Sequence, residues 1–307
     1  MGRALERVSD CAILRAHPVL SVRLGRYTYR IATRGAHSIY TISDGASAFS
    51  APIEWAFGQG QAGQTYVYQR EGSFYESRVS FFNDTQSLDL TLGYSGTRPR
   101  NVVEAAGRRM SPDEAHDCFA CHSTASVSAS GLQLDHFMPG VTCEGCHGPG
   151  AAHVAAIKAG NLKSPHIFDP GRLDTQDLSD FCGSCHRSWQ QVEMMHLQGI
   201  ADVRFQPYRL ATSRCFDALD SRISCLACHN PHDPVRTDAA FYDAKCLACH
   251  HRAEKTHAAV RATARVCPVS RRNCVTCHMP KYALPGAHYK FTDHDIRIVR
   301  AGQPYPD

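Results

Sequence analysis

Two patterns of hydrophobic and polar positions divide this chain of 307 residues. Residues 26–33 (RYTYRIAT) and 37–43 (HSIYTIS) are rich in aromatic and β-branched residues around a short RGA connection, which predicts a β-hairpin. Residues 64–82 (QTYVYQREGSFYESRVSFF) repeat the pattern around a Glu-Gly-Ser turn, and residues 88–94 (LDLTLGY) look like a closing strand. We therefore predict a small antiparallel sheet over residues 20–105.

After this region the chain changes to short helical segments separated by glycine and proline. Ser111-Pro112-Asp113-Glu114 combines a capping serine, a proline at the first helical position and a glutamate three residues after the cap, which predicts a helix start. Asp174 is a candidate cap for a second helix, and the stretch AAFYDAKCLACHH predicts a third. Helices this short bury little conventional core against one another.

The sequence Cys-x-x-Cys-His occurs six times in this second region. In chain order, motifs 1 to 6 are Cys118–His122, Cys143–His147, Cys182–His186, Cys225–His229, Cys246–His250 and Cys274–His278. Twelve of the fifteen cysteines belong to these motifs, and histidine, with 18 of 307 residues, is too rare to follow all six pairs by chance. Zinc sites and thioredoxin-like redox motifs need no histidine at this position, whereas attachment of c-type haem does.

The motifs therefore predict six covalently bound haem c groups. In each motif the two thiols add to the haem vinyl groups, and the histidine becomes the proximal ligand of the iron. The attachment cysteines are Cys118, Cys121, Cys143, Cys146, Cys182, Cys185, Cys225, Cys228, Cys246, Cys249, Cys274 and Cys277. The proximal ligands are His122, His147, His186, His229, His250 and His278.

The predicted fold class is α+β: an N-terminal antiparallel β-rich domain followed by a mainly α, loop-rich hexahaem core, in which the porphyrins replace part of the apolar core. The expected divisions are an N-terminal segment (1–19), a haem-free β-rich domain (20–110), the six-haem domain (111–297) and a C-terminal tail (298–307).

Composition is that of a globular protein, with 43% hydrophobic residues and a formal charge of +4. The propionates and ferric irons of six haems change that balance to roughly −2. Because no block of five or six like charges exists, nucleic-acid binding is not expected. No stretch reaches the eighteen apolar residues of a transmembrane helix.

Haem is attached to such motifs outside the cytoplasmic membrane, so we expect a periplasmic or extracellular protein. The first residues, MGRALERVSDCAILRAHPVL, lack the basic, apolar and small-residue regions of an export signal. We therefore expect that the true N-terminus, with its signal, lies outside this sequence.

Histidines outside the motifs supply candidates for the second axial position of each iron. In HGPGAAH, glycine and proline end the attachment helix, so that His153 points away from its own haem and toward a neighbour. His232 in CHNPH lies too near His229 to reach the opposite face of the same iron. Both are therefore predicted as distal ligands of adjacent haems, with surface histidines as the alternative.

The stretches CEGCHGPGAAH, CLACHNPHD, CVTCHMPK and TDHDI resemble the multihaem cytochrome c superfamily. That group includes hydroxylamine oxidoreductase, pentahaem nitrite reductase, octahaem tetrathionate reductase and tetrahaem electron carriers. The resemblance covers about residues 110–297. It implies that the histidines of Gly-Pro-Gly-x-x-His, Cys-His-x-Pro-His and Thr-Asp-His are distal ligands, which are His153, His232 and His294 here.

For the remaining three haems we predict His136, His196 and His257 as distal ligands, with His116 and His288 as the next candidates. Asp293 or Asp295 is a candidate hydrogen-bond acceptor for the other ring nitrogen of His294. Bis-histidine ligation at low potential is the expectation.

Other residues of the second region have less specific roles. Cys215 and Cys267 are left over in an oxidising compartment, which indicates a disulfide between them. Three arginines lie in one stretch and are expected to bind haem propionates, with a pocket for a substrate anion as the alternative. They are Arg204, Arg209 and Arg214.

The predicted function is electron transfer along closely packed bis-histidine haems. The donor and acceptor are an unidentified redox protein or a quinol-oxidising partner. One alternative is a multihaem oxidoreductase acting on a small nitrogen or sulfur compound at one open or lysine-ligated haem. Nitrite reductase itself is disfavoured because no Cys-x-x-Cys-Lys occurs. The other alternative is a subunit of an extracellular cytochrome filament, or another oligomer.

Overall fold

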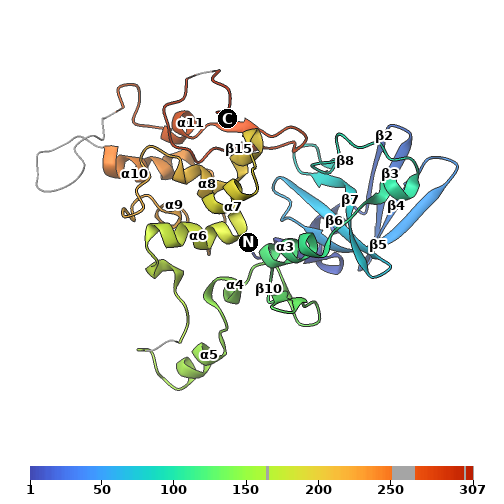
Figure 1. Cartoon of the computed structure of the whole chain (residues 1–307), viewed down its shortest axis with the longest axis horizontal. Helices are drawn as coiled ribbons and strands as arrows, with labels where there is room; N and C mark the ends of the chain where they lie inside the picture. Colours follow the sequence, from blue (N-terminus) through green and yellow to red (C-terminus); the bar gives the residue numbers. More distant parts are fainter. Residues whose placement is uncertain (164–165, 251–266, 301, 307) are drawn as a thin grey trace, which may run out of the picture. The chain divides into compact units, whose positions relative to one another are not determined.

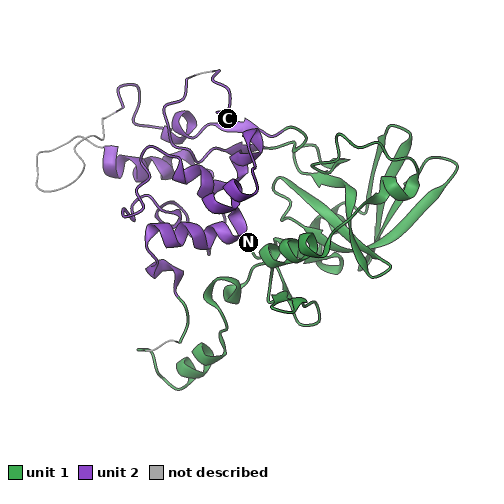
Figure 2. Cartoon of the chain, viewed as in Figure 1, with its two compact units in different colours: residues 1–168, 285–289 green, residues 169–284, 290–307 purple. Residues whose placement is uncertain are grey.

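The computed structural model describes residues 1–163, 166–250, 267–300 and 302–306, with the elements labelled in Figure 1. The chain divides into two compact units (Figure 2). Unit 1 consists of Met1–Phe168 together with Pro285–Tyr289, and unit 2 of Asp169–Leu284 together with Lys290–Asp307. The predicted order, antiparallel strands first and helices later, is confirmed.

Unit 1 is built on an antiparallel sheet with the strand order β2-β3-β4-β5-β6-β7-β8, to which β1 is added on β5 and β9 on β7. Its strands are β1 (Leu5–Arg7), β2 (Val19–Leu24), β3 (Tyr27–Arg34), β4 (His37–Ser43), β5 (Ala48–Phe57), β6 (Gly63–Arg70), β7 (Ser73–Phe82), β8 (Ser87–Leu90) and β9 (Gly107–Arg109). The end strands β2 and β8 contact each other. The sheet therefore curls around one of its faces.

Helices and short strand pairs complete unit 1. Its helices are η1 (Val8–Asp10), α1 (Ala12–Ala16), α2 (Val102–Ala106), α3 (Pro112–His122), α4 (Cys143–His147) and α5 (Ala151–Lys158). Two strand pairs follow α3: β10 (Ser123–Thr124) with β13 (Met138–Pro139), and β11 (Val127–Ser128) with β12 (Gly131–Leu132).

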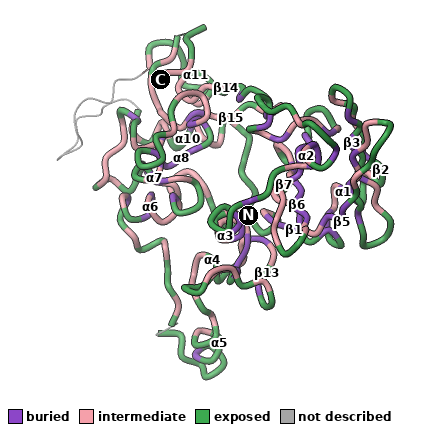
Figure 3. Tube along the Cα trace, turned by 45° about the vertical axis from the view of Figure 1, so that its right-hand side comes forward, coloured by how far each residue is buried: buried purple, intermediate pink, exposed green. Residues whose placement is uncertain are grey.

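Alternation of side chains along the strands forms the core inside the curled sheet. Tyr29 and Ile31 on β3 and Tyr40 and Ile42 on β4 are all buried, whereas the residues between them are more exposed. This period of two places every second residue on the inner face. Figure 3 shows the resulting concentration of buried positions along these strands.

Both predicted hairpins are confirmed. β3 and β4 pair up to Arg34 and His37, across a turn in which Gly35 has φ +59°. β6 and β7 meet across Glu71 and Gly72, which both have positive φ. Two residues of positive φ match the twist of the flanking strands, so the Glu-Gly pair fixes the register of this hairpin.

The predicted closing strand is shorter than expected, because β8 ends at Leu90. Gly93 has φ +94° and turns the chain out of the sheet, and the Tyr94 hydroxyl then donates to the Glu76 carbonyl. β5 was not predicted. Its first half pairs with β4 and its second half with β6, and Pro52, which lacks an N–H, lies where the pairing changes.

A second apolar cluster joins α3 to the sheet. Phe119 is fully buried, and its ring lies 5.8 Å from Trp55, 5.2 Å from Phe57 and 5.5 Å from Phe74. Phe119 is the residue after Cys118, so the helix that carries motif 1 is packed on the β-sheet. The first attachment motif is therefore part of the β-rich unit.

The described residues of unit 2 form short helices and one small hairpin. The helices are η2 (Pro170–Arg172), α6 (Thr175–His186), α7 (Trp189–Met194), η3 (Gly199–Arg204), α8 (Gln206–Ala211), α9 (Cys225–Cys228), α10 (Ala239–His250) and α11 (Cys274–His278). The strands β14 (Lys281–Ala283) and β15 (Lys290–Thr292) pair antiparallel.

The apolar core of unit 2 is thin. Among its described residues, the buried apolar side chains are Leu178, Val192, Val203, Phe205, Pro207 and Leu284. A unit of this length that packed only protein against protein would bury many more such side chains. The described helices therefore leave apolar surface for a large apolar cofactor.

Candidate functional site

Each of the six motifs lies at the end of a helix. α3 and α4 carry motifs 1 and 2 in unit 1, and α6, α9, α10 and α11 carry motifs 3 to 6 in unit 2. In five motifs the histidine is the last helical residue, whereas His229 directly follows α9 in an extended conformation. The common placement presents two thiols and an imidazole together at each helix end.

The predicted helix starts are confirmed for α3 and α6. Ser111 and Glu114 form a capping box at the start of α3, and the Asp174 carboxylate accepts from the Asp177 N–H at the start of α6. The HGPG sequence also behaves as predicted, since α4 ends at His147 and α5 begins at Ala151. Gly148, at φ +71°, makes the turn between them.

Three motif histidines bind a backbone carbonyl through Nδ1. The distances are 2.9 Å from His122 to the Ala4 oxygen, 2.8 Å from His147 to the Phe168 oxygen and 2.9 Å from His278 to the Arg297 oxygen. An Nδ1–H donated to a carbonyl leaves Nε2 as the electron-pair donor, which is the arrangement of a metal-binding histidine. The acceptors lie 118, 21 and 19 residues away in sequence, and no sequence pattern identified them.

His229 and His294 lie close together in unit 2. Their ring centroids are 6.3 Å apart and their planes are inclined by 43°. Two imidazoles that bind opposite faces of one metal ion at about 2.0 Å hold their centroids roughly 6–6.5 Å apart. Nδ1 of His294 lies 3.1 Å from the Thr292 carbonyl, which leaves its Nε2 for a metal.

Burial keeps both imidazoles neutral. It lowers the pKa of His229, and it lowers the pKa of His294 to about 4. Neutral imidazole is the form that binds iron, so neither histidine needs to lose a proton at neutral pH. Both imidazoles are therefore in the protonation state that a metal ligand requires.

The carboxylates beside His294 have a different role from the expected one. Asp293 and Asp295 do not accept from His294; both pair with arginine instead. Arg209 was expected to bind a propionate, but its guanidinium forms a bidentate salt bridge with Asp293, with hydrogen bonds of 2.9 and 3.1 Å. Since both side chains are buried, this guanidinium is satisfied within the protein.

The other predicted distal ligands have varied surroundings. His153 lies on α5 in unit 1, and His136 is exposed between β12 and β13. His232 follows α9, and its backbone N–H donates to the side-chain oxygen of Asn230. His196 is exposed after α7 and has φ +50°. His257 lies outside the described residues.

The two reserve candidates lie beside carboxylates. Nε2 of His288 is 2.7 Å from Asp89, and its ring lies edge-on to Phe82 at 4.8 Å. His116, half-buried on α3, has Nδ1 3.3 Å from Asp117. The Nε2 of His288 is therefore occupied by an acid of the β-rich unit.

Neighbouring motifs of unit 2 lie on helices that pack against each other. α6, which carries motif 3, contacts α9, which carries motif 4, and α10, which carries motif 5, contacts α11, which carries motif 6. Motif 3 therefore adjoins motif 4, and motif 5 adjoins motif 6.

Asp243 fixes the second of these contacts. Its buried carboxylate, on α10, accepts the N–H groups of Asn273 at 2.8 Å and Cys274 at 2.7 Å and so caps α11 from another helix. Two backbone donors at a helix start are thereby satisfied. No pattern in the sequence predicted this role.

We expect Asp243→Ala to speed hydrogen exchange at the amides of Asn273 and Cys274, because both lose their acceptor. Exchange at these two amides, followed by mass spectrometry of the holoprotein, measures the effect. Asp233→Ala is the control, since Asp233 accepts from the Asn230 side chain and should leave both amides unchanged. Unchanged exchange in Asp243→Ala would show that the cap is not formed.

Cys215 and Cys267 are not joined by a disulfide in this structure. Cys215 lies near Cys228 and Cys249, and burial raises its pKa. The disulfide between Cys215 and Cys267 thus stays a prediction.

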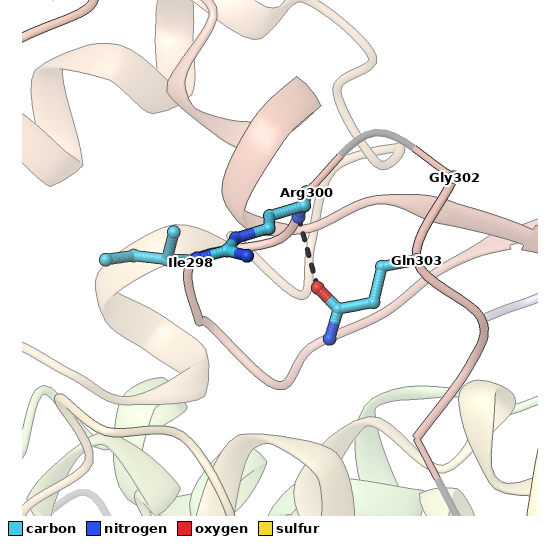
Figure 4. A pocket seen from close by; sticks show the side chains of 4 residues that line it. All are labelled: Ile298, Arg300, Gly302 and Gln303. Atoms are coloured by element: carbon cyan, nitrogen blue, oxygen red, sulfur yellow. Dashed lines mark hydrogen bonds between the residues drawn. The ribbon is translucent and has the colours of Figure 1, made fainter.

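Two surface hollows lie in unit 2. The first is lined by Ile298, Arg300, Gly302 and Gln303, and the Arg300 N–H donates to the Gln303 side chain at 3.1 Å (Figure 4). The second contains His196 together with Glu193 and Tyr208. No motif residue lines either hollow.

The described residues contain no group of three or more His, Cys, Asp or Glu side chains arranged to hold a metal ion. No helix within the same residues has the length and apolar character needed to cross a membrane.

Comparisons with known proteins agree with this geometry. Residues 93–148, which include motifs 1 and 2, match the family model described as cytochrome c554 and c-prime. The chain is also 26% identical over 197 residues to the multiheme cytochrome MtrA of Shewanella baltica (strain OS185). The match covers 61% of this chain and 50% of that protein, so the chain spans about half the length of this relative. No solved structure matches significantly.

The attachment motifs at helix ends, with their oriented imidazoles, are the arrangement that binds c-type haem. The two matches support the same class of protein, a multihaem cytochrome with haem c as its cofactor and electron transfer as its general role.

Proposed function

We propose that the chain binds six haem c groups, one at each motif, and passes electrons along them outside the cytoplasmic membrane. The haem-bearing region is residues 111–297, and the attachment cysteines and proximal histidines are those of motifs 1 to 6. Bound haem c supplies the one-electron change of its iron. The protein supplies the spacing, the axial ligands and the environment.

The contact between motifs carries the proposal. Because the helices of motifs 3 and 4 pack against each other, and those of motifs 5 and 6 do so too, the haems attached to each pair would lie close together. Electron transfer between cofactors needs short distances, and four motifs in one small unit supply them. An enzyme that used a single haem would not need this repetition.

Bis-histidine ligation is proposed first for motif 4, with His229 as the proximal ligand and His294 as the distal one. The centroid distance of 6.3 Å and the acceptor on Nδ1 of His294 support this pair. His153 and His232 remain proposed distal ligands of neighbouring haems. His136, His196 and His257 complete the proposed set.

The protein orients several of these ligands from distant parts of the chain. Ala4 accepts from His122, and the Phe57 ring lies edge-on to the same imidazole at 5.4 Å. A carbonyl acceptor fixes the ring and raises its basicity, which stabilises the ferric form and favours a low potential. Unit 1 would thus set the properties of the first haem in addition to covering it.

Multihaem c-type cytochromes are typically periplasmic or extracellular, and that location is proposed here. The proposed partners are redox proteins or a quinol-oxidising donor on one side and an acceptor on the other. Neither nucleic acid nor a substrate is needed.

Reductive titration of the holoprotein, combined with protein-film voltammetry, tests this function. We expect six electrons to be taken up reversibly per chain, and a mass equal to the polypeptide plus six haems. Nitrite, hydroxylamine and tetrathionate are then added in turn, and we expect no catalytic current. A catalytic current with any of them would contradict the carrier function and favour the oxidoreductase.

A further inference from the structure

A buried ion-pair network lies beside His294 in unit 2. Arg209 on α8 and Asp293 are 6% and 0% exposed, and they are joined by a two-pronged bond. Such a geometry uses the planar guanidinium fork, which lysine lacks. Ion pairs removed from water to this degree are rare unless a structural requirement maintains them.

The network holds a segment of five residues, 293–297, which we call the ligand strap. Arg297, at one end of the strap, pairs with Asp293 at the other and also with Asp295. Arg209, on α8, donates a hydrogen bond to Asp295 at 3.3 Å in addition to those to Asp293. The side chains of the strap are thus tied to one another and to Arg209.

Ser213, four residues after Arg209, ties down the backbone of the strap. Its hydroxyl donates to the His294 carbonyl at 2.8 Å and accepts from the Ile296 N–H at 2.8 Å. The chain direction at His294 is therefore fixed on both sides of this histidine. Its imidazole faces His229, as described above.

The other end of the strap contacts motif 6. The Arg297 carbonyl accepts from Nδ1 of His278 at 2.9 Å, and the Arg297 N–H donates to the His278 carbonyl at 3.2 Å. One short segment therefore contains the proposed distal ligand of motif 4 and the carbonyl that orients the proximal ligand of motif 6.

We propose that Arg209 is a positioning residue for two haems at once, those of motifs 4 and 6, and that it acts through the ligand strap. The inference rests on the proposed function, since it takes His294 and His278 as axial ligands. Arg209 itself touches neither imidazole. It holds Asp293, and the strap then holds His294 for one haem and the Arg297 carbonyl for the other.

The expected consequence is a coupled change when Arg209 is altered. In Arg209→Met the buried Asp293 carboxylate loses both hydrogen bonds from Arg209 and keeps Arg297 as its charged partner. Removing one member of a buried ion-pair network is strongly unfavourable, and we expect this to displace the strap. His294 then leaves its position, and His278 loses its acceptor. Since a carbonyl acceptor makes an imidazole a stronger ligand, its loss changes the electronic state of a second haem without removing a ligand.

Electron paramagnetic resonance of the oxidised holoprotein, with integrated signals, measures both effects. For Arg209→Met we expect one low-spin haem to be lost to a high-spin signal and a second low-spin signal to shift in its g-values. His294→Ala is the reference, because it should give the high-spin signal without the second shift. Arg172→Met is the control, because this exposed arginine of unit 2 pairs with its neighbour Asp169 and has no assigned role at a haem, so it should match the wild type.

Two milder variants separate the effect on motif 4 from the effect on motif 6. They also allow the inference to be tested if Arg209→Met does not accumulate. Ser213→Ala removes the bonds to the His294 carbonyl and the Ile296 N–H, together with a long one to the Arg209 carbonyl, and leaves the Arg209 side chain in place. We expect it to alter the motif 4 signal and leave the motif 6 signal unchanged. Arg209→Lys keeps the buried charge without the fork and should give both changes in weaker form.

The outcomes are distinct. Six unchanged low-spin signals in a fully loaded Arg209→Met protein would overturn the inference, and so would a change confined to the motif 4 signal. If Arg209→Met does not accumulate, the test rests on Arg209→Lys. Absence of both spectral changes in that variant would overturn the inference. The wild-type spectrum is recorded before that of any variant. A wild-type protein without six low-spin haems would contradict the proposed function itself.

Discussion

Replacing His294 with alanine is expected to convert one of six low-spin haems into a high-spin haem that binds carbon monoxide when reduced. The ring of His294 lies 6.3 Å from that of His229, and its Nδ1 has an acceptor, so its removal opens one face of the motif 4 iron. A vacated axial position is taken by water or by a small ligand such as carbon monoxide. Optical titration with carbon monoxide measures the change.

His288→Ala is the matched control for this experiment. His288 was also a candidate distal ligand, but its Nε2 lies 2.7 Å from Asp89 in unit 1. The variant should therefore keep all haems low-spin and bind no additional carbon monoxide. If His288→Ala opened a haem and His294→Ala did not, the ligand assignment would be wrong for both residues.

The second large effect is expected at Phe119, where Phe119→Ala should destabilise unit 1 by about 3–5 kcal/mol. Its ring is fully buried between the sheet and α3 and contacts Trp55, Phe57 and Phe74. Removal leaves a cavity under the helix that carries motif 1. Guanidinium denaturation, followed by circular dichroism of the strands, measures the free energy of unfolding.

Leu162→Ala is the control, because Leu162 belongs to the same unit and is 74% exposed. It should change the unfolding free energy by no more than about 0.5 kcal/mol. Equal stability of Phe119→Ala and the wild type would mean that α3 is not packed on the sheet. The first motif would then be independent of the β-rich unit.

The sequence predicts the local parts of the fold well. Hairpins with glycine turns, such as the one at Gly72, and helix starts, such as Ser111, depend on neighbouring residues and were found from them. β5 was missed because Pro52 disfavours a central strand. Its pairing changes from β4 to β6 at that residue, and only the assembled sheet determines this.

The candidate site divides in the same way. The attachment residues follow from a repeated local pattern, and the motifs lie at helix ends as expected. The groups that orient the ligands do not follow from a local pattern. Ala4 contacts His122 across 118 residues of sequence, and any residue could supply the backbone carbonyl that accepts this bond. Arg209 was predicted to bind a propionate because no local pattern reveals its actual partner, Asp293, which lies 84 residues away in sequence.

One measurement tests the central claim of six fully ligated haems most directly, namely a spin-quantified electron paramagnetic resonance spectrum of the oxidised, fully loaded protein. The account predicts low-spin signals that integrate to all six irons, with no high-spin signal near g of about 6. The total must account for every iron, since coupled haems can conceal intensity. A high-spin signal of about one haem per chain would contradict the carrier function and indicate a site for substrate.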